Sequence, residues 1–262
     1  MAEIANPVRD RLAKGELALG VGLRQARTVD IAMAMKTCDF DWLFIDLEHN
    51  SMDIDMAAQI SVAALGAGIA PLVRVPGGDY GMAARALDNG ALGIVMPHID
   101  TVDQARELAE RLRYPPLGRR SISGAIPQFR FAPGNLSDAV AALNRATLVV
   151  AMIETPKAIE RVDEIAAVDG IDVVMIGTND LSAEFGCTGD FDDPRIADAY
   201  EKTIAACARH KIWPGMGGVY ADAQLERFVG MGMRFILSGN DISFLLSGAK
   251  ARTGALRQIR SR

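Results

Sequence analysis

The sequence predicts an α/β fold of the (β/α)8 TIM-barrel type, with residues 1–262 forming a single domain. Eight short, nearly continuous apolar runs alternate with longer segments of helical period, which is typical of a parallel sheet covered by helices. The chain length of 262 residues is close to the roughly 250 residues of such barrels. Eight runs in a chain of this length favour a closed barrel over an open sheet.

The elements follow one another in a regular order. Residues 1–16 are charged and helical, and they do not resemble a secretion signal. Residues 102–113 and 157–168 have amphipathic helical period, and residues 194–210 begin with a proline that follows two aspartates, which favours a helix start. The eight predicted strands lie at residues 17–22, 41–47, 70–75, 93–98, 148–154, 172–177, 213–218 and 234–239.

One segment interrupts this alternation. Residues 114–136, between the fourth and fifth predicted strands, are rich in Gly, Pro and Arg. Long irregular segments in compact domains usually have a functional or interfacial role. Two interpretations stay open: a segment that contributes to function, or a surface excursion that packs against a neighbouring subunit.

Composition excludes several classes of protein. Half of the residues are apolar and 23% are charged, which argues against a disordered chain. The net charge of −5 argues against a nucleic-acid-binding surface, and no apolar run reaches the roughly 20 residues of a membrane helix. The three cysteines, Cys38, Cys187 and Cys207, include no CxxC pair, so we expect reduced thiols in a cytoplasmic protein.

Two carboxylates end neighbouring predicted strands, where barrel enzymes place their chemistry. Glu154 closes the fifth run, and Asp180 follows the sixth. Two such groups in an apolar barrel would repel each other unless they were paired or bound to a metal. Oxygen ligands with no Cys or His nearby in sequence suit a hard cation such as Mg²⁺, Mn²⁺ or Co²⁺. The alternative is a salt bridge to an arginine such as Arg74.

Arg74 and His49 are the other candidates at strand ends. Arg74 could bind a substrate carboxylate or a developing oxyanion, or it could form a structural pair with Asp46 or Glu48. His49 could act as a general acid–base if a carboxylate holds its ring, and Asp46 and Asp88 are the candidate partners.

Other polar residues have weaker signals. His98 ends the fourth run and is a weaker catalytic candidate than His49, and His210 is expected to be a helix-end residue without a role. None of the six lysines lies in a predicted strand, and the nearest, Lys157, opens a helix, which argues against Schiff-base chemistry. The glycines that end the seventh and eighth runs could bind phosphate, or could simply leave room for substrate.

Six segments resemble the HpcH/HpaI aldolase family, the metal-dependent (class II) pyruvate aldolases related to the citrate lyase β subunit. They occur in the family's order and span most of the chain. These segments are FDWLFIDLEH (40–49), LVRVP (72–76), ALDNGALGIVMPHID (86–100), RYPPLGRRS (113–121), MIETPKAIE (152–160) and DVVMIGTNDLSAEFG (172–186).

The resemblance implies a barrel of the phosphoenolpyruvate/pyruvate type and a homo-oligomer, typically a hexamer built as a trimer of dimers. It also implies roles for the candidate residues. Glu154 and Asp180 would hold the divalent metal that chelates pyruvate, Arg74 would stabilise the enolate oxygen, His49 would act as acid–base with support from Asp46 and Asp88, and the backbone at Gly177, Thr178 and Asn179 would cradle the pyruvate carboxylate.

Two departures from the family bear on substrate range. Met152 stands where some members have glutamine, which removes a hydrogen bond near a metal-bound water. Gly217 and Gly218 stand where some members have bulkier residues, which implies a wider mouth for the acceptor.

The predicted reaction is reversible aldol addition of pyruvate, or hydroxypyruvate, to an aldehyde, with cleavage of 4-hydroxy-2-oxoacids as its reverse. Related alternatives are citrate synthesis and cleavage of a CoA thioester, which would reuse the metal and arginine. More distant alternatives are a phosphosugar isomerase or epimerase and a non-catalytic barrel that binds an oxoacid.

Overall fold

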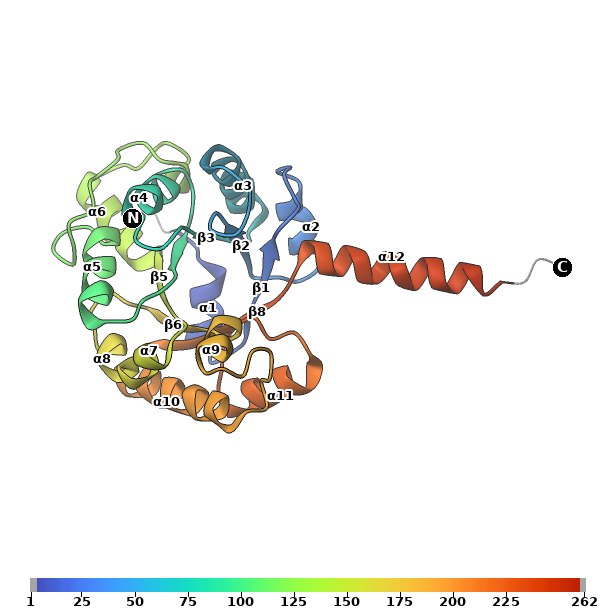
Figure 1. Ribbon diagram of the computed structural model, residues 1–262. Helices are drawn as coiled ribbons and strands as arrows, with labels where there is room; N and C mark the ends of the chain where they lie inside the picture. Colours follow the sequence, from blue (N-terminus) through green and yellow to red (C-terminus); the bar gives the residue numbers. More distant parts are fainter. Residues whose placement is uncertain (1–3, 260–262) are drawn as a thin grey trace.

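The eight predicted strands form one closed parallel barrel in the computed structural model, which describes residues 4–259 (Figure 1). Each strand pairs with the next along the chain, and β8 pairs with β1. The predicted fold class is therefore confirmed, and the predicted strands match the observed ones to within two residues at either end. The strands are β1 (Ala18–Leu23), β2 (Trp42–Asp46), β3 (Ala70–Arg74), β4 (Gly93–Met96), β5 (Leu148–Ile153), β6 (Val173–Gly177), β7 (Trp213–Gly217) and β8 (Phe235–Asn240).

Large side chains fill the barrel interior below the strand ends that carry the candidate site. Trp42 of β2 stacks on Phe235 of β8 with ring centroids 4.1 Å apart. This packing requires Gly20 of β1, where a Cβ atom would lie 2.1 Å from the indole of Trp42. The helix α1 (Pro7–Ala13) packs Val8 and Leu12 against the same apolar cluster, which closes the amino-terminal end of the barrel.

Helices surround most of the barrel and bury their small apolar faces against it. The predicted helix over residues 157–168 is divided in two at Arg161, whose φ of −109° and ψ of 9° interrupt the helical backbone. The helices are α2 (Ile31–Thr37), α3 (Ile54–Ala67), α4 (Tyr80–Asp88), α5 (Val102–Leu112), α6 (Leu136–Ala146), α7 (Pro156–Glu160), α8 (Val162–Ala166), α9 (Thr178–Glu184), α10 (Pro194–His210), α11 (Asp222–Met231) and α12 (Asp241–Arg257).

The irregular segment 114–136 packs on its own chain. Arg120 pairs with Asp88 at the end of α4, at 2.6 Å, and the side chain of Gln128 donates to the carbonyls of Leu87 and Ala91. Its single turn of 3-10 helix, Pro127–Phe129, belongs to an apolar cluster shared with α6. None of its residues lines the cavity at the carboxyl ends of the strands.

The helix α12 differs from the others because it leaves the barrel and extends away from it (Figure 1). None of its residues is buried, and Phe244, Leu245, Leu246 and Leu256 are between 45% and 65% exposed. Among residues 4–259, no helix combines the length and the apolar character that crossing a bilayer demands.

Candidate active site

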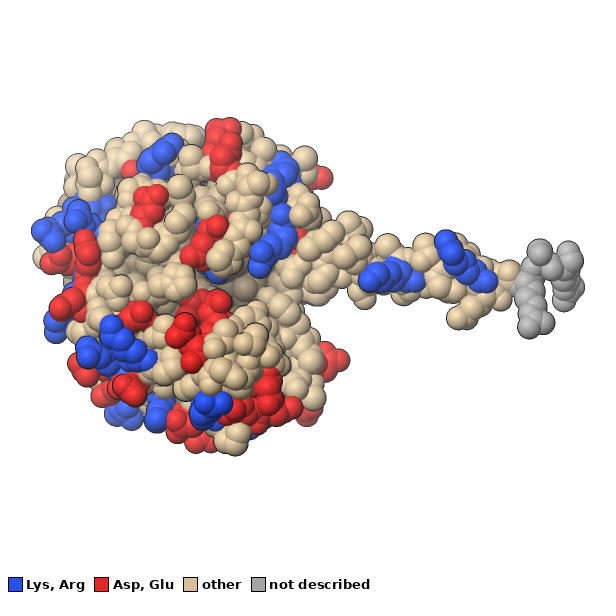
Figure 2. Space-filling model, viewed as in Figure 1, with Lys and Arg blue, Asp and Glu red and all other residues tan. Residues whose placement is uncertain are grey.

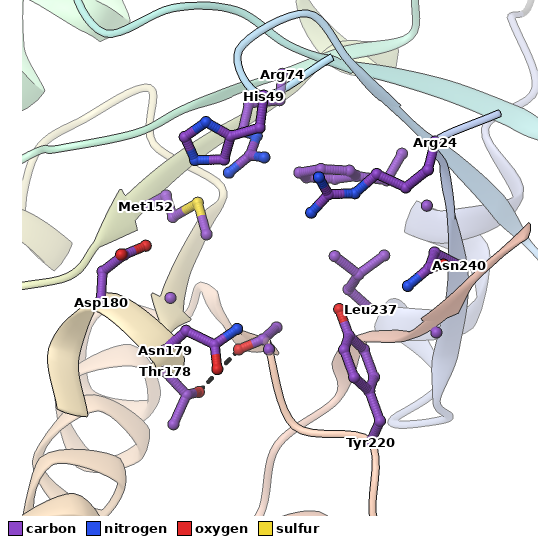
Figure 3. Close-up of a pocket in the computed structure, with 16 residues that line it drawn as sticks. Arg24, His49, Arg74, Met152, Thr178, Asn179, Asp180, Tyr220, Leu237 and Asn240 are labelled. Carbon is purple, nitrogen blue, oxygen red and sulfur yellow. Dashed lines mark hydrogen bonds between the residues drawn. The ribbon is translucent and has the colours of Figure 1, made fainter. Parts of the chain in front are cut away.

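An open cavity lies at the carboxyl ends of the strands, where parallel barrels carry their active sites. It has a volume of about 560 Å³, including the space at its mouth, and residues from β1, β2, β3, β5, β6, β7 and β8 and the loops after them line it. On this face, acidic side chains border the central hollow, and basic side chains lie toward β1 and α2 (Figure 2). The close-up in Figure 3 shows how the lining side chains converge.

Arg74 is held at the floor of this cavity by two acidic residues from β2 and the loop after it. Its guanidinium binds Asp46 through two hydrogen bonds of 2.9 and 2.6 Å, and it lies 3.1 Å from Glu48. Burial alone would raise the pKa of Asp46, but the hydrogen bonds from Arg74 hold that pKa below its ordinary value. The structural pairing weighed for Arg74 is therefore present, and it also orients the guanidinium beside the cavity that Arg74 lines.

Glu154 is the least compensated carboxylate of the site. Its side chain is 2% exposed, and its Oε2 atom accepts a hydrogen bond from the backbone N–H of His98 and lies 3.2 Å from the Nδ1 atom of the same residue. Burial raises the pKa of Glu154 to about 7; His98 opposes this shift, and the nearby charges of Asp180 and Glu48 add to it. A buried carboxylate with this pKa lacks a strong cationic partner.

These groups fit a divalent cation better than a salt bridge. The arginine weighed as a partner of Glu154, Arg74, is paired instead with Asp46 and Glu48. Gly177 leaves room for the carboxylate, because a Cβ atom there would lie 2.3 Å from the Oε1 atom of Glu154. Asp180, in the first turn of α9, lines the cavity, as does Gly177, which lies against the carboxylate of Glu154. Mg²⁺ and Mn²⁺ prefer oxygen ligands such as carboxylates, and a cation bound to Glu154 and Asp180 would offset the repulsion between their charges.

The protein would supply only part of such an ion's coordination shell. Within the described residues, no group of three or more His, Cys, Asp and Glu side chains is arranged to hold a metal ion. Two carboxylates would leave several positions for water and substrate oxygens, a pattern typical of Mg²⁺.

The two candidate histidines lie near different carboxylate oxygens of Glu48. The Nε2 atom of His49 is 3.7 Å from one carboxylate oxygen of Glu48, and the Nε2 atom of His98 is 3.6 Å from the other. Both rings are more than half exposed, and His49 lines the cavity. His98 has a φ of 57°, a conformation that is uncommon for residues other than glycine and that often marks functional sites.

The residues that follow β6 are held in place by buried hydrogen bonds and close packing. Thr178 is fully buried, and its hydroxyl bonds to the hydroxyl of Tyr200 at 2.7 Å and to the carbonyl of Gly217 at 2.8 Å. Asn179 packs against Gly218, where a Cβ atom would lie 2.9 Å from the amide nitrogen of Asn179. Gly217 likewise makes room for Met175, so these glycines are required by packing as well as by access to the cavity.

Asp88 does not join the site within one chain. It is the last residue of α4, which runs from the strand ends back toward the opposite end of the barrel, and its carboxylate pairs with Arg120. Asp46 also leaves the ring of His49 unsupported: its Oδ1 atom accepts the backbone N–H of His49 at 3.3 Å, and both of its oxygens bind Arg74. Among the described carboxylates, the one nearest the ring of His49 is that of Glu48, 3.7 Å from its Nε2 atom and beyond hydrogen-bonding distance.

Two polar lining residues lie two positions beyond predicted strand ends and were not predicted from the sequence. Arg24 immediately follows β1, and Tyr220 lies in the loop after β7. The first and seventh predicted strands end at residues 22 and 218, two residues before Arg24 and Tyr220. Allowing each strand one more residue and including the first residues of each loop would have found both.

Comparisons with known proteins show a family and relatives that are similar to this chain over most of its length. Residues 24–247 match the family described as HpcH/HpaI aldolase/citrate lyase. A 4-hydroxy-4-methyl-2-oxoglutarate aldolase from Hapsidospora irregularis is 36% identical over 99% of this chain and 97% of its own, and a hydroxypyruvate/pyruvate aldolase from Roseovarius nubinhibens is 33% identical over 94% of each. The crystal structure of an HpcH/HpaI aldolase from Desulfitobacterium hafniense superposes with a TM-score of 0.91 at 28% identity, over 98% of this chain and 99% of the other.

Proposed function

This chain belongs to the HpcH/HpaI aldolase/citrate lyase family, and we propose that it is a divalent-metal-dependent aldolase acting on pyruvate or hydroxypyruvate. Its relatives are named aldolases, so the chain is a carbon–carbon lyase and the non-catalytic alternative is set aside. The proposed reaction is reversible aldol addition, with cleavage of 4-hydroxy-2-oxoacids as its reverse.

Each of the candidate residues has its own role in the proposed reaction. Glu154 and Asp180 would hold the cation, which supplies a Lewis acid at the oxygens of pyruvate. The guanidinium of Arg74, fixed by Asp46 and Glu48, would donate hydrogen bonds to the oxygen that becomes negative as the enolate forms. The backbone at Gly177, Thr178 and Asn179 would cradle the carboxylate.

His49 would move the protons. In the addition direction its imidazole would accept a proton from the pyruvate methyl group, and the carbon of that group would then attack the acceptor carbonyl, whose oxygen takes up a proton. In the cleavage direction the same ring would accept the proton of the substrate hydroxyl as the carbon–carbon bond breaks. The exposed position of His49 at the edge of the cavity, 3.7 Å from Glu48, supports this role.

The observation that carries the proposal is the buried carboxylate of Glu154, which lies beside Asp180 and has no arginine partner in the described residues. The test is cleavage of 4-hydroxy-4-methyl-2-oxoglutarate, with pyruvate release coupled to lactate dehydrogenase. We expect turnover with Mg²⁺, Mn²⁺ or Co²⁺, none after chelation, and none in Glu154→Gln or Asp180→Asn.

Glu107→Gln provides the matched control, because Glu107 is an exposed residue of α5 whose carboxylate pairs, among the described residues, only with Arg111 across one helical turn. It should leave turnover and its metal dependence unchanged. Near-normal activity in a folded Glu154→Gln or Asp180→Asn variant would refute the assignment of these residues as ligands.

We further propose a homo-oligomer in the cytoplasm, namely a hexamer built as a trimer of dimers. The exposed apolar residues of α12 support it, because a second copy of the chain would bury them. The free thiols of Cys38, Cys187 and Cys207 are compatible with a reducing compartment. Light scattering should give six times the chain mass, and Leu245→Asp should lower it; a monomeric wild-type protein would refute this assembly.

A further inference from the structure

Arg24 is the one guanidinium lining the cavity, among the described residues, whose charge has no close partner. The nearest carboxylate oxygen is the Oδ2 atom of Asp46, 3.9 Å from its Nη1 atom, and both oxygens of Asp46 already bind Arg74. The side chain of Arg24 is 43% exposed. Its guanidinium is therefore available to an anion that enters the cavity.

The backbone that carries Arg24 is fixed. The carboxylate of Asp241, at the start of α12, accepts three backbone hydrogen bonds from this loop: from Arg24 at 2.8 Å, Gln25 at 2.9 Å and Ala26 at 2.7 Å. Arg27 also donates to the carbonyl of Arg24. Bracing fixes the backbone from which the side chain of Arg24 extends, so binding a ligand costs no backbone ordering at this loop.

Arg24 faces the carboxylate end of the cavity from the far side. In Figure 3, Asp180 and Met152 lie on one side, and Arg24, Tyr220 and Asn240 lie on the other. Burial raises the pKa of Tyr220, while the charges of Arg24 and Arg74 lower it, which places the phenol near both cations. The side-chain oxygen of Asn240 accepts from the backbone of Ser243, which leaves its amide N–H groups as donors.

The cavity is thus acidic on the side of Asp180 and basic on the side of Arg24. Pyruvate, held at Glu154 and Asp180 under the proposed function, would direct its methyl carbon toward the middle of the cavity, where the acceptor carbonyl must lie. The remainder of the acceptor then extends toward Arg24, Tyr220 and Asn240, which together offer a positive charge, a phenol hydroxyl that can donate and the amide N–H groups of Asn240. A planar guanidinium recognises a carboxylate through two parallel hydrogen bonds.

We propose that Arg24 binds a carboxylate on the acceptor, so that the acceptor is an oxoacid rather than a neutral aldehyde. This inference rests on the proposed aldolase function and names the substrate class of the same site. With glyoxylate as the probe, the pyruvate methyl group loses one proton, its carbon bonds to the aldehyde carbon, and the aldehyde oxygen gains a proton. The product, 4-hydroxy-2-oxoglutarate, carries a carboxylate at each end.

The test compares two small acceptors that differ in charge, glyoxylate and glycolaldehyde, each added to pyruvate with excess Mn²⁺. We expect wild-type kcat/KM to be higher for glyoxylate. In Arg24→Gln the ratio of the two kcat/KM values should fall by about 10- to 100-fold, the range for losing hydrogen bonds to a charged group. Arg24→Lys, which keeps the charge without the bidentate geometry, should fall less.

Arg106→Gln is the control, because Arg106 is an exposed arginine of α5 that pairs, within residues 4–259, only with Asp103; the ratio should not change. Deuterium exchange at the pyruvate methyl group, catalysed by the wild-type protein without acceptor, tests the proposed aldolase function separately from the role of Arg24. Exchange together with an unchanged ratio in both Arg24 variants overturns this inference alone. Failure of the wild-type protein to exchange refutes the proposed function, and this inference with it.

Discussion

Replacing Gly177 with alanine tests the position of Glu154 directly. The added Cβ atom would lie 2.3 Å from the Oε1 atom of Glu154 and 2.7 Å from its Cγ atom. Carbon–oxygen contacts normally begin near 3.3 Å, so the carboxylate must move by about 1 Å. Metal–oxygen bonds tolerate only about 0.2 Å, and Glu154 would therefore leave the coordination shell.

We expect Gly177→Ala to weaken Mn²⁺ binding by at least about 10-fold. Changing residues that only hydrogen-bond to metal ligands already weakens metal binding by about 10- to 100-fold. Overpacking should also lower the free energy of unfolding by about 1–3 kcal/mol, which leaves the protein folded. Titration of free Mn²⁺ by electron paramagnetic resonance measures the first effect, and urea unfolding in a chelator measures the second.

Gly66→Ala is the matched control, since a Cβ atom at this exposed position of α3 meets nothing within 4 Å. It should leave Mn²⁺ affinity unchanged and raise stability by up to about 1 kcal/mol, because alanine favours the helix. Wild-type Mn²⁺ affinity in a folded Gly177→Ala protein would refute the account of Glu154 as a ligand.

Three further predictions concern neighbouring groups. Because the folded-state pKa of Glu154 is about 7, above its unfolded value of 4.5, the metal-free protein should lose up to a few kcal/mol of stability as pH rises from about 4.5 through 7. Thermal melts in a chelator should show this loss in wild type and not in Glu154→Gln; equal slopes would contradict it. Asp46→Asn should lower the free energy of unfolding in urea by about 3 kcal/mol. This is the lower end of the range for breaking a buried pair, because Arg74 keeps its second acidic partner, Glu48. A loss below about 1 kcal/mol would show that the pair is dispensable. His49→Gln should slow exchange at the pyruvate methyl group by at least about 10-fold more than His98→Gln does, and the opposite order would move the acid–base role to His98.

The barrel could be predicted because its strands are buried on both faces and appear as apolar runs. The same logic located Arg74, Glu154 and Asp180, since a charged residue at the end of such a run must lie at the carboxyl end of the barrel. Arg24 escaped this reasoning because it lies just beyond a strand end, and its importance depends on which carboxylates Arg74 has already engaged.

Two other features could not be read from the sequence alone. Asp88 stands close to a strand in sequence, but α4 carries it to the other end of the barrel, where Arg120 pairs with it. The helix α12 has ordinary helical residues, and periodicity gives no sign of whether a helix returns to its own barrel. Both depend on tertiary placement, which local patterns do not specify.

The central claim is that Glu154 and Asp180 hold a divalent cation that allows this chain to form the enolate of pyruvate. The most direct measurement is hydrogen–deuterium exchange at the pyruvate methyl group, followed by proton NMR in D₂O with Mn²⁺, Mg²⁺ or Co²⁺ and with a chelator. The account predicts exchange that requires the cation and is lost in Glu154→Gln. Exchange that persists in the chelator, or no exchange with any of the three ions in the folded protein, would contradict it.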